Sequence, residues 1–276
     1  MYAICRVLKM KNTTDISASD NHCMRVDGRG TEDSHIDSEL SQHNVYSQNY
    51  HREDGSAMGL NEALETAIQN YEIKVPRKDS VKIVEFMFTL SPEYFEGVNV
   101  SNGLNDPKIK AFYRSASDFL GRENDIVLDF HLHLDETTPH IHAHVIMTDT
   151  NKKGECILNA SKKLDGRKKL SALQDRYFDS MKRHVPGLKR GIPSEITNAK
   201  HMTLKQIRKS LQTLIKTGLS NEIINHVARE LVVNPSLGIE KAIEIAKGKP
   251  AQHDQRAEEL KQNPLKVNNK GFSKDL

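Results

Sequence analysis

The sequence predicts an α+β fold in which an antiparallel sheet packs against helices. The patterns along the chain indicate, in order, a strand, a helix, a strand, a helix, a hairpin of two strands and then helices only. Hydrophobic residues make up 37% and aromatic residues 5% of the 276 residues, with no tryptophan. This content favours one modest core with long polar flanks.

The N-terminal half contains two predicted strands and two predicted helices. Residues 2–9 alternate in a way typical of a buried strand, and residues 81–90 form a continuous β-rich run typical of a central strand. Apolar side chains at helical spacing predict helices over residues 61–71 and 107–120. Residues 12–58 are rich in Asn, Asp, Ser, His and Gly, which predicts a long loop that is either functional or disordered.

The C-terminal half begins with the hairpin and continues with helices. Residues 125–134 and 140–148 are predicted strands that flank a short turn. Two basic helices and then two shorter ones are expected over residues 168–184, 203–216, 221–232 and 239–246. From residue 248 onward the chain is polar, and we expect it to be disordered.

The positive charges of the chain gather in one region, although its formal net charge is only +3. Residues 152–216 contain 17 lysines and arginines against 5 aspartates and glutamates, whereas residues 27–72 lean acidic. Such a basic region predicts contact with a polyanion on one surface. The alternative interpretation is a solvated helical face.

Cysteine usage and hydropathy indicate a cytoplasmic protein. The three cysteines, Cys5, Cys23 and Cys156, are odd in number and widely spaced, which argues against a disulfide framework or a thiolate zinc site. No stretch of the sequence approaches the roughly 18 apolar residues that a membrane span needs. The charged, alternating residues 1–11 do not resemble a signal peptide.

Five of the 13 histidines lie in the predicted hairpin, on one face of its two strands. Because side chains alternate along a strand, this face carries the polar residues Asp129, His131, His133, His140, His142 and His144. The opposite face carries the apolar residues Leu128, Phe130, Leu132, Leu134, Ile141, Ala143 and Val145. Packing does not account for a face of imidazoles, because a buried imidazole loses hydration unless it has a partner.

The imidazole face predicts a metal site. A His-x-His pair on one strand and a histidine on its neighbour bring three nitrogens, from His133, His140 and His142, toward one point. Imidazole is a common ligand of divalent transition metals, and three protein ligands leave coordination positions for a substrate oxygen. His131 and His144 are expected to support these ligands or to face solvent.

The same residues resemble a motif of a known family. Residues 133–142, HLDETTPHIH, are similar to the third motif of the MobV (Pre/Mob) plasmid mobilisation relaxases, His-x-Asp-Glu-x-Thr-Pro-His-x-His. His22 and Arg25 have the spacing of the family's N-terminal His-x-x-Arg motif, and Asn44 lies where the family has an Asn-containing motif. The resemblance extends over about residues 1–200, and it includes the first strand and residues 78–95.

The chain also departs from the family pattern at two points. Cys23 follows His22, where the family often has asparagine. The C-terminal part shows no sustained heptads, whereas family members often carry a long coiled-coil-like region there.

The resemblance implies an HUH-type relaxase with a five-stranded antiparallel sheet backed by helices over residues 1–198. A helical extension over residues 199–248 and a polar, disordered tail over residues 249–276 are expected to follow. The implied activity is that of a metal-dependent, site- and strand-specific DNA endonuclease and strand transferase. It would nick plasmid DNA at a transfer origin and keep a transient covalent protein–DNA link, for mobilisation or recombination. Implied cofactors are Mn²⁺ or Mg²⁺, and implied partners are plasmid DNA and conjugation machinery in a bacterial cytoplasm.

The resemblance also implies roles for single residues. His22 would be the nucleophile, and Glu136 would fix its tautomer or contact the metal through water. Arg25 would grip a phosphate. Further predicted DNA contacts are Asn44, Lys168, Lys169, Lys182 and Arg183.

Several alternatives stay open. Tyr46 and Tyr50 are rival nucleophiles, because they lie in the same polar segment as His22. The run His-x-His-x-His at residues 140–144 also resembles the motif of histidine-triad nucleotide hydrolases and transferases, whose middle histidine attacks an α-phosphate without a metal. That interpretation leaves HLDETTP unexplained. A third possibility is a DNA-binding or metal-sensing relative that does not nick DNA.

Overall fold

A computed structural model of the chain describes residues 1–26, 36–123, 125–191, 223–224, 226–227 and 239–247. The chain divides into two compact units, Met1–Gly191 and Ile192–Leu276. The helix expected near the end is present as α9, Ile239–Ala246. The helix expected over residues 203–216, most of that over 221–232 and the tail lie outside the described residues, as do the predicted boundaries at 198 and 248.

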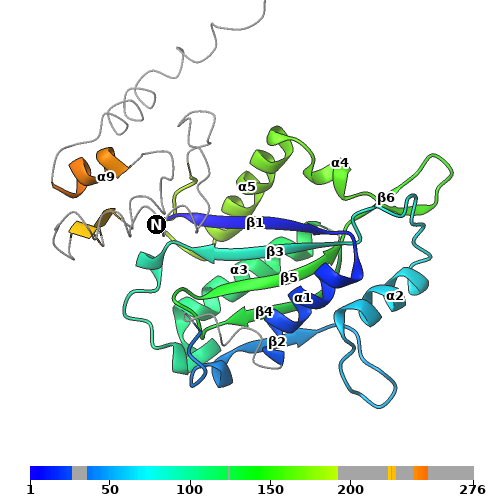
Figure 1. Cartoon of the computed structure of the whole chain (residues 1–276), viewed down its shortest axis with the longest axis horizontal. Coiled ribbons are helices and arrows are strands. Elements are labelled where there is room, and N and C mark those ends of the chain that lie inside the picture. Colours follow the sequence, from blue (N-terminus) through cyan, green and yellow to red (C-terminus); the bar gives the residue numbers. More distant parts are fainter. Residues whose placement is uncertain (27–35, 124, 192–222, 225, 228–238, 248–276) are drawn as a thin grey trace, which may run out of the picture. The chain divides into compact units, whose positions relative to one another are not determined.

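The first unit contains the five-stranded antiparallel sheet that was predicted. Its strands lie in the order β1-β3-β5-β4-β2, and every neighbouring pair is antiparallel (Figure 1). Their bounds are Ala3–Met10 for β1, Val45–Gln48 for β2, Ile83–Leu90 for β3, Ile126–His133 for β4 and His140–Ile146 for β5. The histidine-bearing hairpin therefore forms the middle of the sheet, beside the continuous β-rich strand β3.

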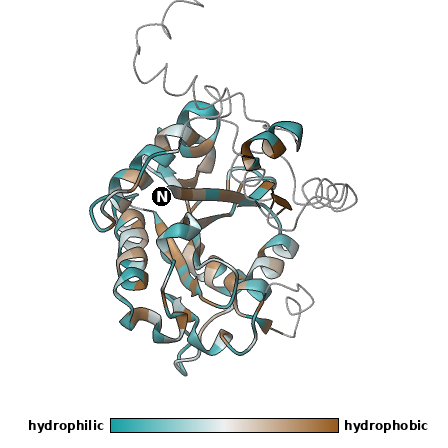
Figure 2. Cartoon of the chain, turned by 90° about the vertical axis from the view of Figure 1, so that its left-hand side faces the viewer, coloured by the Kyte–Doolittle hydropathy of each residue, from teal (hydrophilic) through white to brown (hydrophobic). Residues whose placement is uncertain are grey.

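Helices cover both faces of this sheet. Helices α3, Pro107–Glu123, and α5, Arg167–Met181, pack on one face, while α1, Thr13–Cys23, and α2, Leu60–Asn70, lie on the face that carries the histidines (Figure 1). In Figure 2 the strands are coloured mostly as hydrophobic, and the helices around them carry both hydrophobic and hydrophilic residues. Each face thus has its own apolar core.

The larger core lies between the sheet and helices α3 and α5. Its centre is aromatic, because the rings of Phe88 and Tyr177 stack with centroids 5.0 Å apart and Phe119 meets both edge-on. The smaller core lies on the histidine face under α1 and α2 and contains Met10, Ile16, Leu60, Ala63, Leu64, Ala67, Ile73, Ile83, Leu128, Ile146 and Leu158. The histidines on the same face of the sheet lie outside this apolar core.

Two expectations about these elements were wrong. Residues 12–58 are not one long loop, because they include α1, a short 3-10 helix at Ser41–His43 and the edge strand β2. Helix α1 buries only Ile16 and Cys23 among otherwise polar residues, so it lacks an apolar stripe. Leu128 does not share the apolar face of the hairpin, since a bulge between Val127 and Asp129 turns it toward the smaller core.

Short elements complete the first unit. They are the 3-10 helices Pro92–Tyr94 and Val100–Asn105, the β6–β7 hairpin of Thr148–Thr150 and Cys156–Leu158, and helix α4, Ala160–Leu164. Among the described residues, no helix is long and apolar enough to cross a membrane.

Candidate metal and nucleic-acid site

The histidines of β4 and β5 form a compact cluster on one face of the sheet. His133 is the cross-strand partner of His140, and His142 follows two residues further along β5. The three ring centroids lie 4.9–5.2 Å from one another, and all three residues are buried. The structure therefore brings together the three residues predicted as metal ligands.

Hydrogen bonds hold one nitrogen of each ring, and the second nitrogen of His133, Nδ1, also lies 3.2 Å from the guanidinium of Arg25. His140 donates from Nδ1 to the Thr138 carbonyl at 2.9 Å, and His133 donates from Nε2 to the Cys23 carbonyl at 3.0 Å. His142 donates from Nδ1 to the buried carboxylate of Glu85. Within the described residues its Nε2 is buried without a hydrogen-bond partner, which is costly unless a ligand occupies it. These histidines fit a divalent metal, because a hydrogen bond from one nitrogen of each ring fixes the orientation of that ring.

The ligand atoms fall into two overlapping groups. Atoms of His22, His133 and His142 lie within 4.8 Å of one another, and so do atoms of His133, Glu136 and His140. Oε1 of Glu136 is 3.6 Å from Nε2 of His140 and 3.8 Å from Nδ1 of His133. His133 belongs to both groups, and neither group contains His133, His140 and His142 together, so their shared role as ligands of one cation stays a prediction.

His22 reaches this cluster from the last turn of α1. Its ring centroid lies 5.5 Å from that of His142 and 5.9 Å from that of His133, and its Nε2 is 3.9 Å from Oε1 of Glu136. Burial, and then the charge of Arg25, lower the pKa of His22 below its ordinary value. The ring is therefore neutral near pH 7, which is the protonation state a nucleophile needs.

Arg25 joins the end of α1 to the turn after β4. Its guanidinium donates two hydrogen bonds to Asp135, at 2.7 and 3.0 Å, one to Glu136 at 2.7 Å and one to the His22 carbonyl at 2.9 Å. Burial opposes ionisation of Asp135, yet hydrogen bonds from Arg25, Ser41 and Asn44 hold the pKa of this carboxyl below its usual range. In this arrangement Arg25 orients Glu136. The contact of Arg25 with a DNA phosphate stays a prediction.

The other predicted DNA contacts lie elsewhere. The side chain of Asn44 accepts a hydrogen bond from the Leu134 amide at 2.7 Å and donates one to Asp135 at 2.8 Å. It thus fixes β2 to the turn after β4. The basic pairs Lys168–Lys169 and Lys182–Arg183 lie at opposite ends of α5, on the other face of the sheet. The structure does not bring them to the histidines, and their DNA contact also stays a prediction.

The two rival tyrosines differ in their surroundings. The ring centroid of Tyr46 on β2 lies 5.6 Å from that of His131, and Tyr46 is 39% exposed. Tyr50 packs against the smaller apolar core, and burial raises the pKa of its hydroxyl. Of the two, Tyr46 borders the histidine cluster.

A buried polar network that the sequence did not predict supports the cluster. Oγ of Ser19 on α1 donates to Glu85 at 3.1 Å and lies 2.8 Å from Nε2 of His144, whose Nδ1 donates to Asp129 at 2.6 Å. Burial lowers the pKa of His144, but the Asp129 carboxylate outweighs it and the pKa lies above its ordinary value. His131 and His144 are fully buried, so the expected alternative of solvent exposure was wrong. One signal was available, since Glu85 is the lone charge in the run IVEFMFTL.

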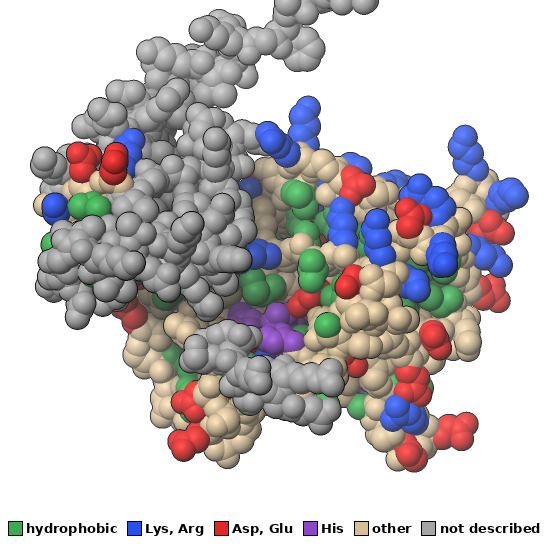
Figure 3. Space-filling view, viewed as in Figure 1, with side chains coloured by type: hydrophobic (Ala, Val, Ile, Leu, Met, Phe, Trp, Pro, Cys, Tyr) green, Lys and Arg blue, Asp and Glu red, His purple; other side chains and the backbone are tan. Residues whose placement is uncertain are grey.

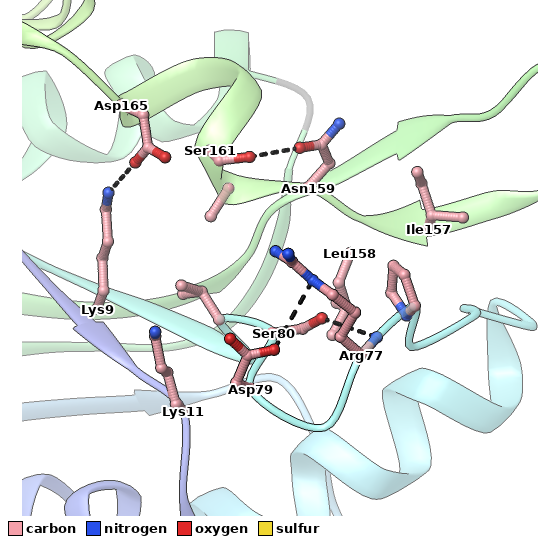
Figure 4. Close-up of a pocket in the computed structure, with 13 residues that line it drawn as sticks. Lys9, Lys11, Arg77, Asp79, Ser80, Ile157, Leu158, Asn159, Ser161 and Asp165 are labelled. Atoms are coloured by element: carbon pink, nitrogen blue, oxygen red, sulfur yellow. Dashed lines mark hydrogen bonds and ion pairs between the residues drawn. The ribbon is translucent and has the colours of Figure 1, made fainter.

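A pocket of about 380 Å³ lies away from the histidines, between the loop before β3, the end of β1 and the β7–α4 segment (Figure 4). Lys9, Lys11 and Arg77 line it together with Asp79 and Asp165. Lys9 pairs with Asp165, and Arg77 lies 3.7 Å from Asp79, so the charges are largely balanced within the wall. The pocket contains no histidine and is not part of the cluster described above.

Comparison with known proteins identifies the family. The family model described as plasmid recombination enzyme matches residues 1–209. The chain belongs to this family. It is 29% identical over 216 residues to plasmid recombination enzyme type 3 of Staphylococcus aureus, an alignment that covers 76% of the chain and 48% of that protein. It is 32% identical over 218 residues to a 65 kDa protein of Zymomonas mobilis, which covers 76% of the chain and 34% of that protein.

Solved relaxase structures share the fold. The Mn-bound relaxase domain of MobM, in complex with the oriT DNA of plasmid pMV158, superposes with a TM-score of 0.60 at 22% sequence identity. The match covers 76% of the chain and 99% of that domain. The prediction of a relaxase-like antiparallel fold is thereby confirmed. The chain spans about half the length of the plasmid recombination enzymes it matches.

Proposed function

We propose that the chain is a relaxase that nicks one strand of plasmid DNA at a transfer origin by metal-assisted transesterification. The observation that carries this proposal is the meeting of His22 with the buried cluster of His133, His140 and His142. Membership of the plasmid recombination enzymes supports it, as does the fold shared with the MobM relaxase domain, which binds Mn and oriT DNA in its crystal structure. The transient covalent product would serve mobilisation or recombination.

The three clustered histidines would hold Mn²⁺ or Mg²⁺, which would neutralise charge on a non-bridging oxygen of the scissile phosphate. The neutral ring of His22 supplies a nitrogen lone pair for attack on phosphorus. A P–N bond forms and the P–O bond to the leaving strand breaks. The leaving oxygen takes up a proton from water, and the phosphorylated ring gives up its remaining N–H proton to Glu136 or to water. Because the new link is itself activated, the reverse reaction rejoins the strand.

Two residues would prepare His22 for this attack. Glu136 lies 3.9 Å from Nε2 of His22, where it can accept a proton directly or through a water. Arg25 binds both Glu136 and the His22 carbonyl, so it fixes the distance between the two side chains. The remaining predicted DNA contacts are Asn44, Lys168, Lys169, Lys182 and Arg183.

The setting of this activity follows from the same proposal. The DNA partner would be the transfer origin of a plasmid in a bacterial cytoplasm, and conjugation machinery would be a further partner. The catalytic domain would comprise residues 1–198, followed by a helical extension over 199–248 and a polar tail. No particular observation favours a histidine-triad nucleotide hydrolase, and the family match argues against it.

The decisive experiment is to trap and map the covalent adduct. Full-length protein with Mn²⁺ is incubated with a supercoiled plasmid carrying the cognate transfer origin, and the DNA-linked peptide is identified by mass spectrometry. We expect a nicked plasmid and a link to His22. DNA binding without nicking or adduct would instead support the non-catalytic relative, and a link to Tyr46 would move the nucleophile.

A further inference from the structure

A second group of potential metal ligands lies deeper on the histidine-bearing face of the sheet. In the register of β4 and β5, the pair of Asp129 and His144 follows the pair of His131 and His142. Histidine side chains are visible in a hollow of this face (Figure 3), but His131 and His144 are 0% exposed and Asp129 is only 4% exposed. Helix α1 lies in front of these strands (Figure 1). The group is therefore enclosed between the sheet and α1.

His131 is the member of this group that packing does not explain. Both of its ring nitrogens are buried, and neither has a hydrogen-bond partner among the described residues. Nε2 lies 3.4 Å from Oδ2 of Asp129, and the rings of Tyr46 and His144 are its aromatic neighbours. A buried imidazole whose two nitrogens lack partners is costly, so this ring indicates a ligand that binds a nitrogen.

The ligand atoms of this group are close enough to share one cation. One atom each from Asp129, His131 and His144 lies within 4.8 Å of the other two. Nδ1 of His144 is 2.6 Å from Oδ1 of the same carboxylate that Nε2 of His131 approaches. In a tetrahedral zinc site, ligand atoms about 2.1 Å from the metal lie about 3.4 Å from one another. Nε2 of His131 and Oδ2 of Asp129 already have this separation, 3.4 Å.

A hydrogen-bonded chain orients His144 from the side opposite Asp129. Oγ of Ser19 has one proton, which it donates to Glu85 at 3.1 Å, so it accepts the Nε2 proton of His144 at 2.8 Å. Nδ1 of His144 then faces Asp129. A cation that binds Nδ1 displaces the proton there, which leaves to solvent. Metal-bound histidines are commonly held in this way, through a hydrogen bond from the ring nitrogen that does not bind the metal.

Buried charge also favours a cation at this place. Glu85, His144 and Asp129 are successive cross-strand neighbours, and both carboxylates are buried. Burial opposes ionisation of Asp129, but the charge of His144 outweighs it and holds the pKa of this carboxyl below its usual range. A protonated His144 balances one of the two negative charges, whereas a divalent cation balances both.

We propose that Asp129, His131 and His144 bind a second divalent metal ion, separate from the one predicted at the catalytic histidines. Two imidazoles and one carboxylate suit Zn²⁺ better than Mg²⁺ or Mn²⁺, which prefer oxygen ligands. Because all three ligands are buried, the ion is structural rather than catalytic, and it ties β4 to β5 beneath α1. This site does not depend on the proposed nicking activity.

One neighbouring group competes for His144. Atoms of Cys23, Glu85 and His144 also lie within 4.8 Å of one another. The carboxylate of Glu85 is already bonded to His142, however, and a cation in this group would leave both nitrogens of His131 without a partner. The group that contains His131 is therefore the better site.

The zinc content of full-length variants tests the proposal. Protein freed of metal with a chelator is equilibrated with Zn²⁺, desalted and analysed by inductively coupled plasma mass spectrometry. We expect His131→Phe to retain one zinc ion fewer than wild type, His142→Ala to lose a different ion, and the double variant to lose both. A zinc content of His131→Phe equal to that of wild type would overturn the proposal, whatever happens at His142.

Thermal unfolding with and without Zn²⁺ gives a second readout. Phenylalanine resembles histidine in size and needs no hydrogen-bond partner, so metal-free His131→Phe should unfold at or above the Tm of metal-free wild type. At a zinc concentration about a hundred times the Kd, the Tm of wild type should rise roughly 5–10 °C more than that of the variant. Equal rises would contradict a second site. If His131→Phe does not fold, Asp129→Asn gives the same comparison, because it keeps the shape of the side chain and removes its charge.

Two control variants make the result specific. His184 also faces a carboxylate, that of Asp118 on α3, at 2.9 Å, so His184→Phe removes a histidine–carboxylate pair away from the site. It should leave the zinc content and the zinc-dependent rise in Tm unchanged. Cys23→Ser should do the same. Loss in Cys23→Ser of the ion that His131→Phe lacks would overturn the ligand set proposed here, and neither result would bear on nicking.

Discussion

Replacing Glu85 should weaken metal binding although this residue is not expected to touch the metal. Its buried carboxylate accepts a hydrogen bond from Nδ1 of His142. This bond keeps the proton on Nδ1 and leaves Nε2 as the free ligand atom. Burial opposes ionisation of Glu85, but the hydrogen bond with His142 holds its pKa below the usual value, so the carboxylate is charged at neutral pH.

The size of the effect follows from this contact. Loss of a carboxylate behind a metal-bound histidine costs about 10- to 100-fold in metal affinity, or roughly 1.4–2.8 kcal/mol. Glu85→Gln keeps an acceptor for the His142 proton and loses only the charge, so we expect about tenfold. Glu85→Ala also leaves the Nδ1 proton unpaired in a buried place, so we expect about a hundredfold.

Isothermal titration with Mn²⁺ on metal-free protein measures both variants directly. Glu123→Gln is the matched control, because Glu123 is also a largely buried carboxylate in an ion pair, with Arg176, but lies away from the histidines. Circular dichroism verifies that each variant is folded. Metal affinity in Glu85→Ala equal to that of wild type, with the fold intact, would refute the assignment of His142 as an oriented ligand.

Three further outcomes are expected. His142→Ala should abolish both Mn²⁺ uptake and nicking, as seen by metal analysis of the purified protein and by plasmid relaxation; unchanged metal content would remove His142 from the ligand set. His22→Ala should bind DNA yet fail to nick, Tyr46→Phe should still nick, and the trapped adduct should be labile in acid and stable in base, as a phosphoramidate is. An acid-stable adduct would point to tyrosine. Charge reversal at Lys182 and Arg183 should weaken binding to all DNA sequences alike, and an effect confined to the cognate origin would show base contacts instead.

The histidine face of the hairpin was predictable because side-chain alternation along a strand is a local property. The period of two assigned His133, His140 and His142 to one side, and the structure places them there. The same rule failed at Leu128, because a bulge adds one residue to β4 and turns that side chain over. Nothing in the alternation of the sequence marks such an insertion.

Elements that depend on distant contacts were not predictable in this way. Helix α1 has a capping asparagine at Asn12, but only Ile16 and Cys23 of its residues are buried. Its position comes from packing against α2 and the smaller core rather than from an apolar stripe of its own. Glu85 was missed for the same reason, since its partner His142 lies 57 residues further along the chain.

The departure at Cys23 loses its significance once the contacts are known. The family often has asparagine at this position, where this chain has Cys23. In the structure the Cys23 side chain is buried, and it is the backbone carbonyl that accepts the hydrogen bond from Nε2 of His133. A carbonyl is present whatever the side chain, so the orientation of His133 does not depend on asparagine. The end of α1 thus supports the cluster through its backbone at Cys23 and through the side chains of His22 and Arg25.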